Sequence, residues 1–305
     1  MNKSLVADLT LLLVVLIWGA TFVVVQDAIS FLTPFSFNAV RFFIAFVALA
    51  IFYIFFTKKK AKTFNKATIQ AGAMLGFWLF LAYGLQTLGL LYTTPAKTGF
   101  ITGLSVVLVP VFSFFLLKMR PNRNVIIGII CATIGLYMIT MLQASAFSKG
   151  DFFVLLGAIC FAMHIITTSK YAKNFQALPL TIVQILTVSV FSFVVSLFLE
   201  NPKEMYRIDV LFQKEVIMGL LITALLATAF AFLAQTYFQA YTSPTRVALI
   251  FAMEPVFAAI TSYFVINETF TTTMLIGCIL IFAGIIFAEL PVKKQPIAEG
   301  SSIES

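Results

Sequence analysis

Residues 83–100 read YGLQTLGLLYTTPAKTGF, and residues 232–249 read FLAQTYFQAYTSPTRVAL. The two stretches share a polar pattern when they are aligned with a shift of 149 residues. This shift superposes two tyrosines, two glutamines, two threonines, two prolines and two basic residues, namely Tyr92 with Tyr241, Gln86 with Gln235, Thr87 with Thr236, Pro95 with Pro244 and Lys97 with Arg246. The duplication predicts that the chain consists of two related halves.

The composition of the whole chain is that of an integral membrane protein. Hydrophobic residues make up 61% of the 305 residues and charged residues only 10%, whereas soluble domains are about half apolar and about a quarter charged. The apolar runs reach the roughly 20 residues that a helix needs to cross about 30 Å of hydrocarbon. Strands of a β-barrel would alternate polar and apolar residues over about ten positions, so we expect the spans to be helices.

Charged clusters and Pro, Gly or Asn residues divide the chain into ten predicted membrane-spanning helices. Five fall in each half, at 9–29, 34–56, 68–91, 95–117 and 124–143, and at 151–169, 179–199, 216–240, 244–266 and 271–290. The first apolar run continues to Val25 without a clear cleavage pattern, which favours a retained helix over a signal peptide.

The duplication extends beyond the two opening stretches. Gly128 and Gly135 precede Gly277 and Gly284 by the same 149 residues. Slightly smaller shifts of 145 and 143 residues align further pairs, namely Pro34 with Pro179, Asp8 with Asp151 and Trp18 with Phe161. An odd number of crossings makes the second copy enter the membrane from the opposite side. The expected fold is therefore an all-α integral membrane protein with ten transmembrane helices as a 5+5 inverted repeat, covering residues 1–147 and 148–291, before a polar, disordered cytoplasmic tail at 292–305.

The basic residues predict the orientation of the chain. The net charge is +8, but the largest cluster, from Lys58 to Lys66, lies between two apolar runs. We interpret it as a topology signal and not as a nucleic-acid site. With the N-terminus inside, 14 of the 20 Lys and Arg residues are cytoplasmic, 5 are external and Arg41 lies within a span. We therefore expect a multi-pass protein of the cell membrane with both termini in the cytoplasm.

Other classes of membrane protein lack support in the apolar runs. The three cysteines, Cys131, Cys160 and Cys278, show no metal-type spacing, so neither a zinc site nor a disulfide framework is expected. A single histidine and the absence of a mid-span aspartate argue against an intramembrane enzyme. A channel would carry charged rings or a repeated filter sequence. We expect no catalytic residue, no metal and no cofactor, while a structural or sensory membrane module stays open.

Four motifs follow one another in a fixed order: WGATF at 18–22, Pro34 through Arg41-Phe42, FITGLSVVLVPVF at 100–112 and MEPVFAAITSYFVINE at 253–268. Together with the duplication they resemble the EamA-type branch of the drug/metabolite transporter superfamily, over residues 5–290. The resemblance implies secondary transport of small metabolites, often export of amino acids or related compounds, through a central cavity between two repeats. Nucleotide-sugar or lipid-linked-sugar carriers of the wider superfamily are the alternative.

Polar residues within the spans are the candidates for a substrate site, because inverted-repeat transporters bind substrate near the midplane. Glu254 is the only carboxylate near the centre of a span, and such acids usually mark an ion or substrate route. It either carries a proton or binds substrate, or it is paired with Arg41 or a freed backbone group. Gln86 and Gln235 either line a shared cavity or bond to each other. His164 either lines the cavity or hydrogen-bonds a neighbour. The aromatic candidates Trp18, Trp78, Tyr83 and Tyr237 either form walls of the cavity or pack, and Thr21 and Ser105 are further candidates.

Proline, basic and glycine residues are candidates for helix breaks, gates and close packing. Pro110 and Pro255 lie within the fourth and ninth predicted spans and are expected to be packed kinks or gating hinges. Lys97 and Arg246 lie near opposite faces if the repeat is inverted, where they either reach the headgroups or act as gates. The spacing of Gly72 with Gly76, and of Gly99 with Gly103, predicts close contacts between helices.

Overall fold

The computed structural model describes residues 3–57, 64–93, 95–140, 147–201, 208–211, 213–266 and 271–290, and within these ranges all regular elements are helices. The first half of the chain contains α1 (Lys3–Phe31), α2 (Pro34–Phe56), α3 (Lys66–Leu90), α4 (Pro95–Gly103), α5 (Ser105–Leu117) and α6 (Arg123–Thr140). The second half contains α7 (Lys149–Tyr171), α8 (Ala177–Leu199), α9 (Ile208–Leu211), α10 (Lys214–Ala224), the π-helical turn η1 (Leu225–Phe230), α11 (Ala231–Phe238), the 3-10 turn η2 (Gln239–Tyr241), α12 (Pro244–Phe251), α13 (Glu254–Ile266) and α14 (Thr272–Glu289).

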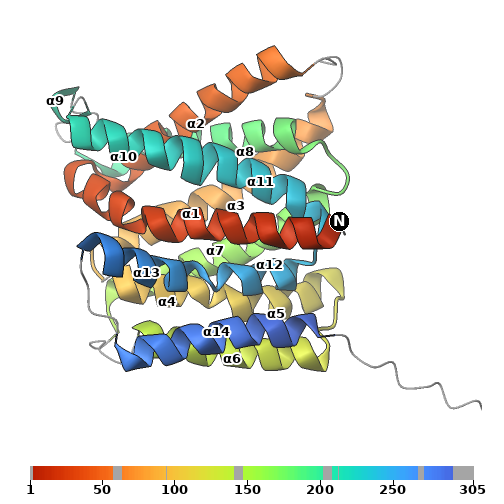
Figure 1. Ribbon diagram of the computed structural model, residues 1–305. Coiled ribbons are helices and arrows are strands. Elements are labelled where there is room, and N and C mark those ends of the chain that lie inside the picture. Colours follow the sequence, from red (N-terminus) through yellow and green to blue (C-terminus); the bar gives the residue numbers. More distant parts are fainter. Residues whose placement is uncertain are drawn as a thin grey trace, which may run out of the picture.

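The helices form a bundle whose members run between two ends of the molecule (Figure 1). Eight segments are long and apolar enough to cross a membrane, and two shorter apolar helices cover Arg123–Ile139 and Thr272–Ala288. A multi-pass, all-α membrane protein is therefore confirmed in the described residues, while the number of ten spans stays a prediction. The predicted tail at 292–305 and most of the 58–66 cluster lie outside the described residues.

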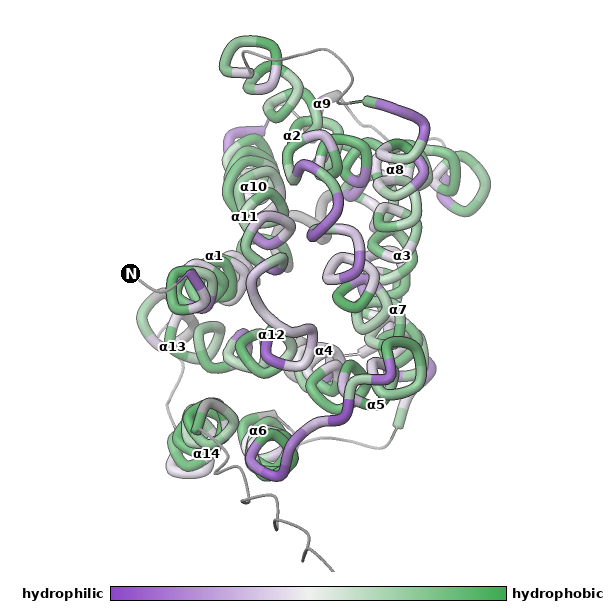
Figure 2. The backbone as a smooth tube through the Cα atoms, turned by 90° about the vertical axis from the view of Figure 1, so that its right-hand side faces the viewer, coloured by the Kyte–Doolittle hydropathy of each residue, from purple (hydrophilic) through white to green (hydrophobic). Residues whose placement is uncertain are grey.

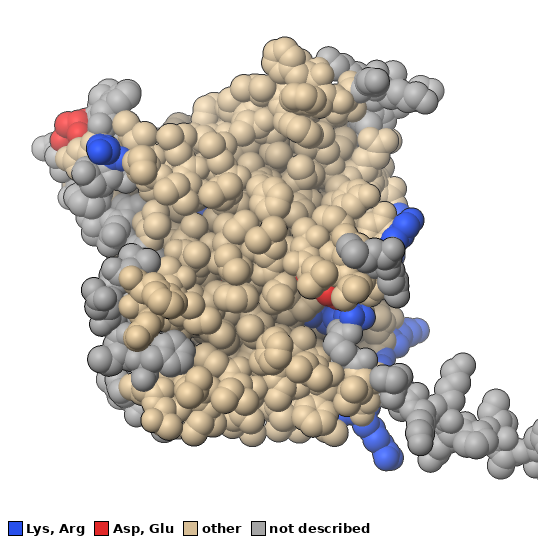
Figure 3. All heavy atoms as spheres, in the orientation of Figure 1, with Lys and Arg blue, Asp and Glu red and all other residues tan. Residues whose placement is uncertain are grey.

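The surface of the bundle matches a lipid environment. Large apolar side chains such as Phe55, Phe115 and Phe198 are exposed, although soluble proteins rarely expose large contiguous apolar patches. On the face shown in Figure 3, uncharged residues cover the middle, and Lys and Arg lie mostly at the end where α1 begins. A bilayer would cover the middle of this surface and leave the charged ends in water.

Several helices begin where the sequence supplies a cap or a proline. Ser243 accepts a hydrogen bond from the backbone N–H of Arg246 and precedes Pro244, the first residue of α12. Ser148 and Asp151 form a reciprocal capping box at the start of α7. Such caps satisfy backbone N–H groups that the first turn leaves unpaired, and proline at the first position has no N–H to lose.

Two segments of the bundle are interrupted at corresponding positions. The first breaks at Leu104, between α4 and α5, and the second breaks at Ala252 and Met253, between α12 and α13. Leu104 and Met253 are 149 residues apart, which is the shift of the duplicated stretches. In Figure 1 the α4–α5 and α12–α13 segments run in opposite directions.

The prolines explain only one of these two breaks. Pro255 is the second residue of α13 and directly follows the break, whereas Pro110 lies inside α5, after the break at Leu104. The sequence predicts the first interruption at Pro110, but the structure places it at Leu104. At Leu104 the backbone N–H lies within hydrogen-bond distance of both Phe100 O and Ile101 O, a tighter turn of the kind common at helix ends.

Glycines allow α6 and α14 to lie side by side at one edge of the bundle, as Figures 1 and 2 show. A Cβ atom added to Gly128 would lie 2.5 Å from Gly284 O, and one added to Gly135 would lie 2.5 Å from Gly277 O. These distances leave room only for hydrogen, so the four glycines permit the close backbone approach that small residues give in membranes.

The predicted glycine contacts of α3 are confirmed, and one of those of α4 is wrong. Gly72 and Gly76 lie against Val183 and Thr187 of α8. Gly103 meets Leu136, but a Cβ at Gly99 would have no neighbouring atom within 4 Å. Spacing alone therefore did not identify which glycines lie at an interface.

Candidate functional site

Four aromatic rings from four helices meet inside the bundle. Trp18 of α1 lies 5.5 Å from Phe232 of α11, and Tyr83 of α3 lies 5.3 Å from Phe161 of α7, measured between ring centroids. Tyr83 and Phe232 lie 6.1 Å apart and join the two pairs. In sequence, Phe232 follows Tyr83 by 149 residues and Phe161 follows Trp18 by 143. The two ring pairs are therefore equivalent under the shifts that align the two halves, and we call these four residues the aromatic cluster.

A buried arginine lies beside this cluster. The Arg41 guanidinium of α2 lies 5.2 Å from the ring of Tyr83, and its Nε donates a 2.7 Å hydrogen bond to Thr228 Oγ1 of η1. The carbonyl of Ala227, also in η1, accepts hydrogen bonds from Arg41 Nη2 at 3.5 Å and from Trp18 Nε1 at 2.8 Å. A π-helical turn alters the regular backbone pairing and often occurs at functional sites.

Glu254 is the first residue of α13, at the break between α12 and α13. Glu254 is half-buried, and its backbone carbonyl lies close to α1, since a Cβ added to Gly19 would be 2.8 Å from Glu254 O. Among the described residues it forms no ion pair with Arg41, so that sequence-based alternative lacks support. Pro255 has no N–H, so it cannot donate a hydrogen bond to the carbonyl of Phe251. The ring centroid of Phe251 lies 5.1 Å from that of Trp18, which places this break beside the aromatic cluster.

Gln86 and Gln235 have separate partners and do not bond to each other. Gln86 Nε2 donates a 2.9 Å hydrogen bond to Thr102 Oγ1 of α4. Gln235 Nε2 donates a 3.2 Å hydrogen bond to Gln239 Oε1, while the Oε1 of Gln235 is buried and has no partner in the described part of the chain. An unsatisfied buried amide oxygen is costly, and a polar substrate that donates a hydrogen bond would remove this cost.

His164 belongs to a buried polar network, in line with the sequence-based alternative that it hydrogen-bonds a neighbour. Its Nε2 lies 3.2 Å from Gln184 Oε1, and Gln184 Nε2 donates a 3.1 Å hydrogen bond to Thr236 Oγ1. The first half has a corresponding contact, in which Asn38 Nδ2 donates a 2.9 Å hydrogen bond to Thr87 Oγ1. Both duplicated threonines are thus held by an amide on the second helix of their own half. The sequence signal that could have revealed these contacts is an amide residue within each of two apolar helices, Asn38 in α2 and Gln184 in α8.

The remaining predicted site residues are dispersed. Ser105 is buried at the start of α5, 149 residues before Glu254. Thr21 is buried and bonds to the carbonyls of its own helix. Trp78 is half-buried against Phe77, and Tyr237 is exposed beside Tyr241. The structure therefore brings Trp18 and Tyr83 together near Glu254 and leaves Tyr237 at the surface.

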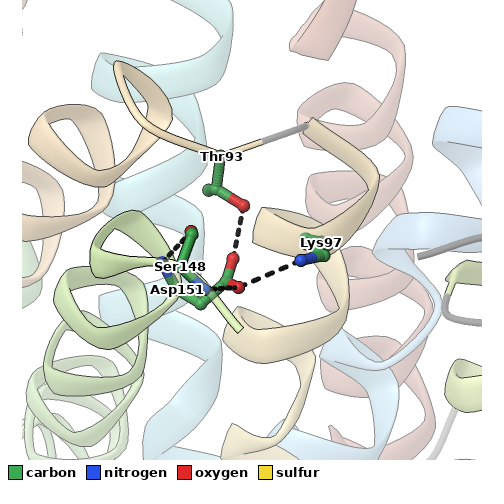
Figure 4. Close-up of polar contacts among 4 residues, drawn as sticks. All are labelled: Thr93, Lys97, Ser148 and Asp151. Carbon is green, nitrogen blue, oxygen red and sulfur yellow. Dashed lines mark hydrogen bonds and ion pairs between the residues drawn. The ribbon is translucent and has the colours of Figure 1, made fainter. Parts of the chain in front are cut away.

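Both basic gate candidates form ion pairs that join the two halves of the chain. Lys97 Nζ lies 3.1 Å from Asp151 Oδ2 (Figure 4), and Arg246 Nη2 lies 2.6 Å from Asp8 Oδ2. The sequence favoured cations that reach the headgroups, but the structure buries Lys97 in a contact with an acid. In the sequence, Asp8 and Asp151 stand out only as an aligned pair.

Comparisons with known proteins agree with this architecture. A model of the EamA-like transporter family matches residues 5–141 and again residues 148–290. An uncharacterized transporter of Archaeoglobus fulgidus is 35% identical over 95% of this chain and 88% of its own length. The uncharacterized transporter YoaV of Bacillus subtilis is 25% identical over 93% of this chain and 97% of its own length. A protein crystal structure with 16% identity superposes with a TM-score of 0.77 over 93% of this chain and 96% of that one, which shows a shared fold.

The relatives' names and the two family matches indicate a membrane transporter and not an enzyme. They cover both halves of the bundle, including the aromatic cluster, the two interrupted segments and both ion pairs. The chain therefore belongs to the EamA-like transporter family.

Proposed function

We propose that the protein is a secondary transporter of small polar metabolites, such as amino acids or related compounds, that works by alternating access in the cell membrane. Export is the expected direction. The observation that carries this proposal is the aromatic cluster, because equivalent residues of two halves meet there beside an acid at a helix break. Transporters with inverted repeats bind substrate at such an interface.

The proposal includes ten spans in a 5+5 inverted repeat, divided between residues 1–147 and 148–291. Crosswise glycine contacts support it. Gly128 meets Gly284 and Gly135 meets Gly277, whereas the sequence shift aligns Gly128 with Gly277 and Gly135 with Gly284. A two-fold relation between α6 and α14 produces this exchange of partners. The opposite directions of the two interrupted segments support the same relation.

Within the proposed site, Glu254 carries a proton or contacts a substrate amine, while the amides of Gln86 and Gln235 offer both donors and acceptors. The direct test offers a mixture of amino acids, related metabolites and nucleotide sugars to purified protein in proteoliposomes and measures which compounds are transported. Movement of an amino acid or related compound above that of protein-free vesicles supports the proposal. Movement of nucleotide sugars alone would favour the alternative carrier class.

We expect leucine at Gln86 or at Gln235 to lower transport by roughly 5- to 30-fold, which corresponds to about 1–2 kcal/mol. Leucine fills a similar space but cannot bond a polar substrate. The variants are compared in proteoliposomes at equal protein content, with Gln176→Leu as a matched control, because Gln176 is exposed and its side chain makes no capping bond. A fully active Gln86→Leu/Gln235→Leu double variant would eliminate a substrate role for both amides.

The orientation gives a separate prediction. The positive-inside rule places both termini and the 58–66 loop in the cytoplasm and Asp209 outside. In a variant lacking the native cysteines, an impermeant thiol reagent added to intact cells should label a cysteine at Asp209 and not one in the 58–66 loop. Permeabilised cells, in which both positions should react, are the control. Labelling of the loop in intact cells would reverse the predicted topology.

A further inference from the structure

One inter-half ion pair lies at the end of the molecule opposite the N-terminus. Lys97, in the first turn of α4, and Asp151, in the first turn of α7, have side chains that are only 5% and 2% exposed. Thr93 Oγ1 also donates to the Asp151 carboxylate, and the Ser148 backbone N–H donates to Asp151 Oδ2 at 2.7 Å (Figure 4). This pair is shielded from water and surrounded by further hydrogen bonds, which strengthen a buried ion pair.

The second inter-half ion pair lies at the end where α1 begins. It joins Arg246, in the first turn of α12, to Asp8 of α1, and the two side chains are 33% and 15% exposed. Arg246 Nη1 also donates to Ser4 Oγ at 3.3 Å. Although 2.6 Å separates the charged atoms, their geometry is not that of a hydrogen bond, and neither Asp8 oxygen has a hydrogen-bond partner in the described residues.

The two pairs are equivalent under the shifts that align the halves. Arg246 follows Lys97 by 149 residues, and Asp151 follows Asp8 by 143. Each pair joins the start of an interrupted segment in one half to the first helix of the other half. Because the two interrupted segments run in opposite directions (Figure 1), one pair lies at each end of the bundle.

We infer that Lys97–Asp151 and Arg246–Asp8 are the two gates of the transporter, and that they open alternately. This inference rests on the proposed function and adds Asp8 and Asp151 to the residues with a role in transport. Each pair holds an interrupted segment against the first helix of the other half at one end. When one pair breaks while the other holds, that segment moves away from its partner helix at that end only, and the interior opens to one side. The present structure has both pairs formed.

The two gates differ in strength. The Arg246–Asp8 pair is partly exposed and its carboxylate accepts no hydrogen bond among the described residues, so water and salt weaken it more than the buried, hydrogen-bonded Lys97–Asp151 pair. The N-terminal end should therefore open more readily in the absence of substrate. Asp151 also caps α7, so Lys97, and not Asp151, is the residue to change when the gate is tested without removing the cap.

The test measures the side from which the interior is reached. The native cysteines are replaced, a reporter cysteine is placed at the buried Ser105, and an impermeant thiol reagent is applied to sealed vesicles of either orientation. Lys97→Gln should raise the labelling rate from the side opposite the N-terminus by at least about fivefold, the lower end of usual coupling between sites. Arg246→Gln should do the same from the N-terminal side. Lys170→Gln is the control, because Lys170 is exposed and lies outside both pairs.

A charge-swapped variant, Asp8→Arg with Arg246→Asp, should return labelling to the level of the parent protein, whereas either single reversal should not. The gate proposal would be overturned if Lys97→Gln and Arg246→Gln were both labelled at the rate of the Lys170→Gln control. It would also be overturned if the charge swap did not restore the labelling rate of the parent protein. The assay needs no substrate, so it separates the two proposals. Unchanged labelling in a protein that transports metabolites refutes the gates alone, and shifted labelling without transport of any tested metabolite refutes the substrate class alone.

Discussion

Glu254→Gln is expected to remove the dependence of transport on a proton gradient and to lower gradient-driven transport by about 5- to 150-fold, the usual range of coupling between two binding sites. Glu254 is the half-buried acid at the α12–α13 break, and it forms no ion pair with Arg41 among the described residues. Glutamine has nearly the same shape but cannot carry the proton or the charge. Packing around Pro255 and the contact of α1 with α13 should therefore persist.

The measurement is transport into proteoliposomes with and without an imposed pH gradient, at equal amounts of reconstituted protein. Asp209→Asn serves as a matched control, because it also neutralises an acid but lies exposed on α9. The control should keep the pH response of the parent. If Glu254→Gln transports at the parent rate and responds to pH in the same way, Glu254 has a structural role only.

Gly135→Ala is expected to destabilise the protein by about 1–3 kcal/mol, the usual cost of overpacking a tight contact. The added Cβ would lie 2.5 Å from Gly277 O. A backbone oxygen within a helix cannot rotate away as a flexible side chain can, so α6 and α14 must separate. Since both helices are apolar, lipid rather than water would enter the gap, and the main loss is close backbone packing.

Gly99→Ala is the matched control for this prediction. Gly99 also lies in a helix, but a Cβ there would meet no atom within 4 Å. Both substitutions bring the same favourable change in helix propensity, so any difference between them reports the contact. Thermal unfolding of purified protein in detergent measures it. Equal melting temperatures for the two variants would contradict the close approach of α6 and α14.

The position of the helices followed from the sequence because it depends on local properties. A segment in lipid must satisfy its own backbone hydrogen bonds, so an apolar run of sufficient length is a helix regardless of its neighbours. The predicted ranges 34–56 and 179–199, for example, correspond to α2 at Pro34–Phe56 and α8 at Ala177–Leu199. The repeated glycines of α6 and α14 were also visible as a pattern, although their crosswise contacts were not.

The site was only partly predictable. Trp18, Tyr83 and Glu254 were candidates, but so was Tyr237, which is exposed. The sequence suggests Arg41 only as a partner of Glu254, whereas in the structure Arg41 donates a hydrogen bond to Thr228 in a π-helical turn. The prolines predict the helix breaks, yet the first break precedes Pro110.

Hydrophobicity and repetition are properties of segments, so the bundle of apolar helices and its duplicated polar pattern can be read from the amino-acid order alone. The folded chain was needed to see that Lys97 meets Asp151, that Arg246 meets Asp8, and that Gln86 and Gln235 have separate partners. Contacts between helices depend on how each helix is rotated and how deeply it is placed. These helices are apolar on the faces toward lipid and toward protein alike, so their sequences carry little information on which face turns inward.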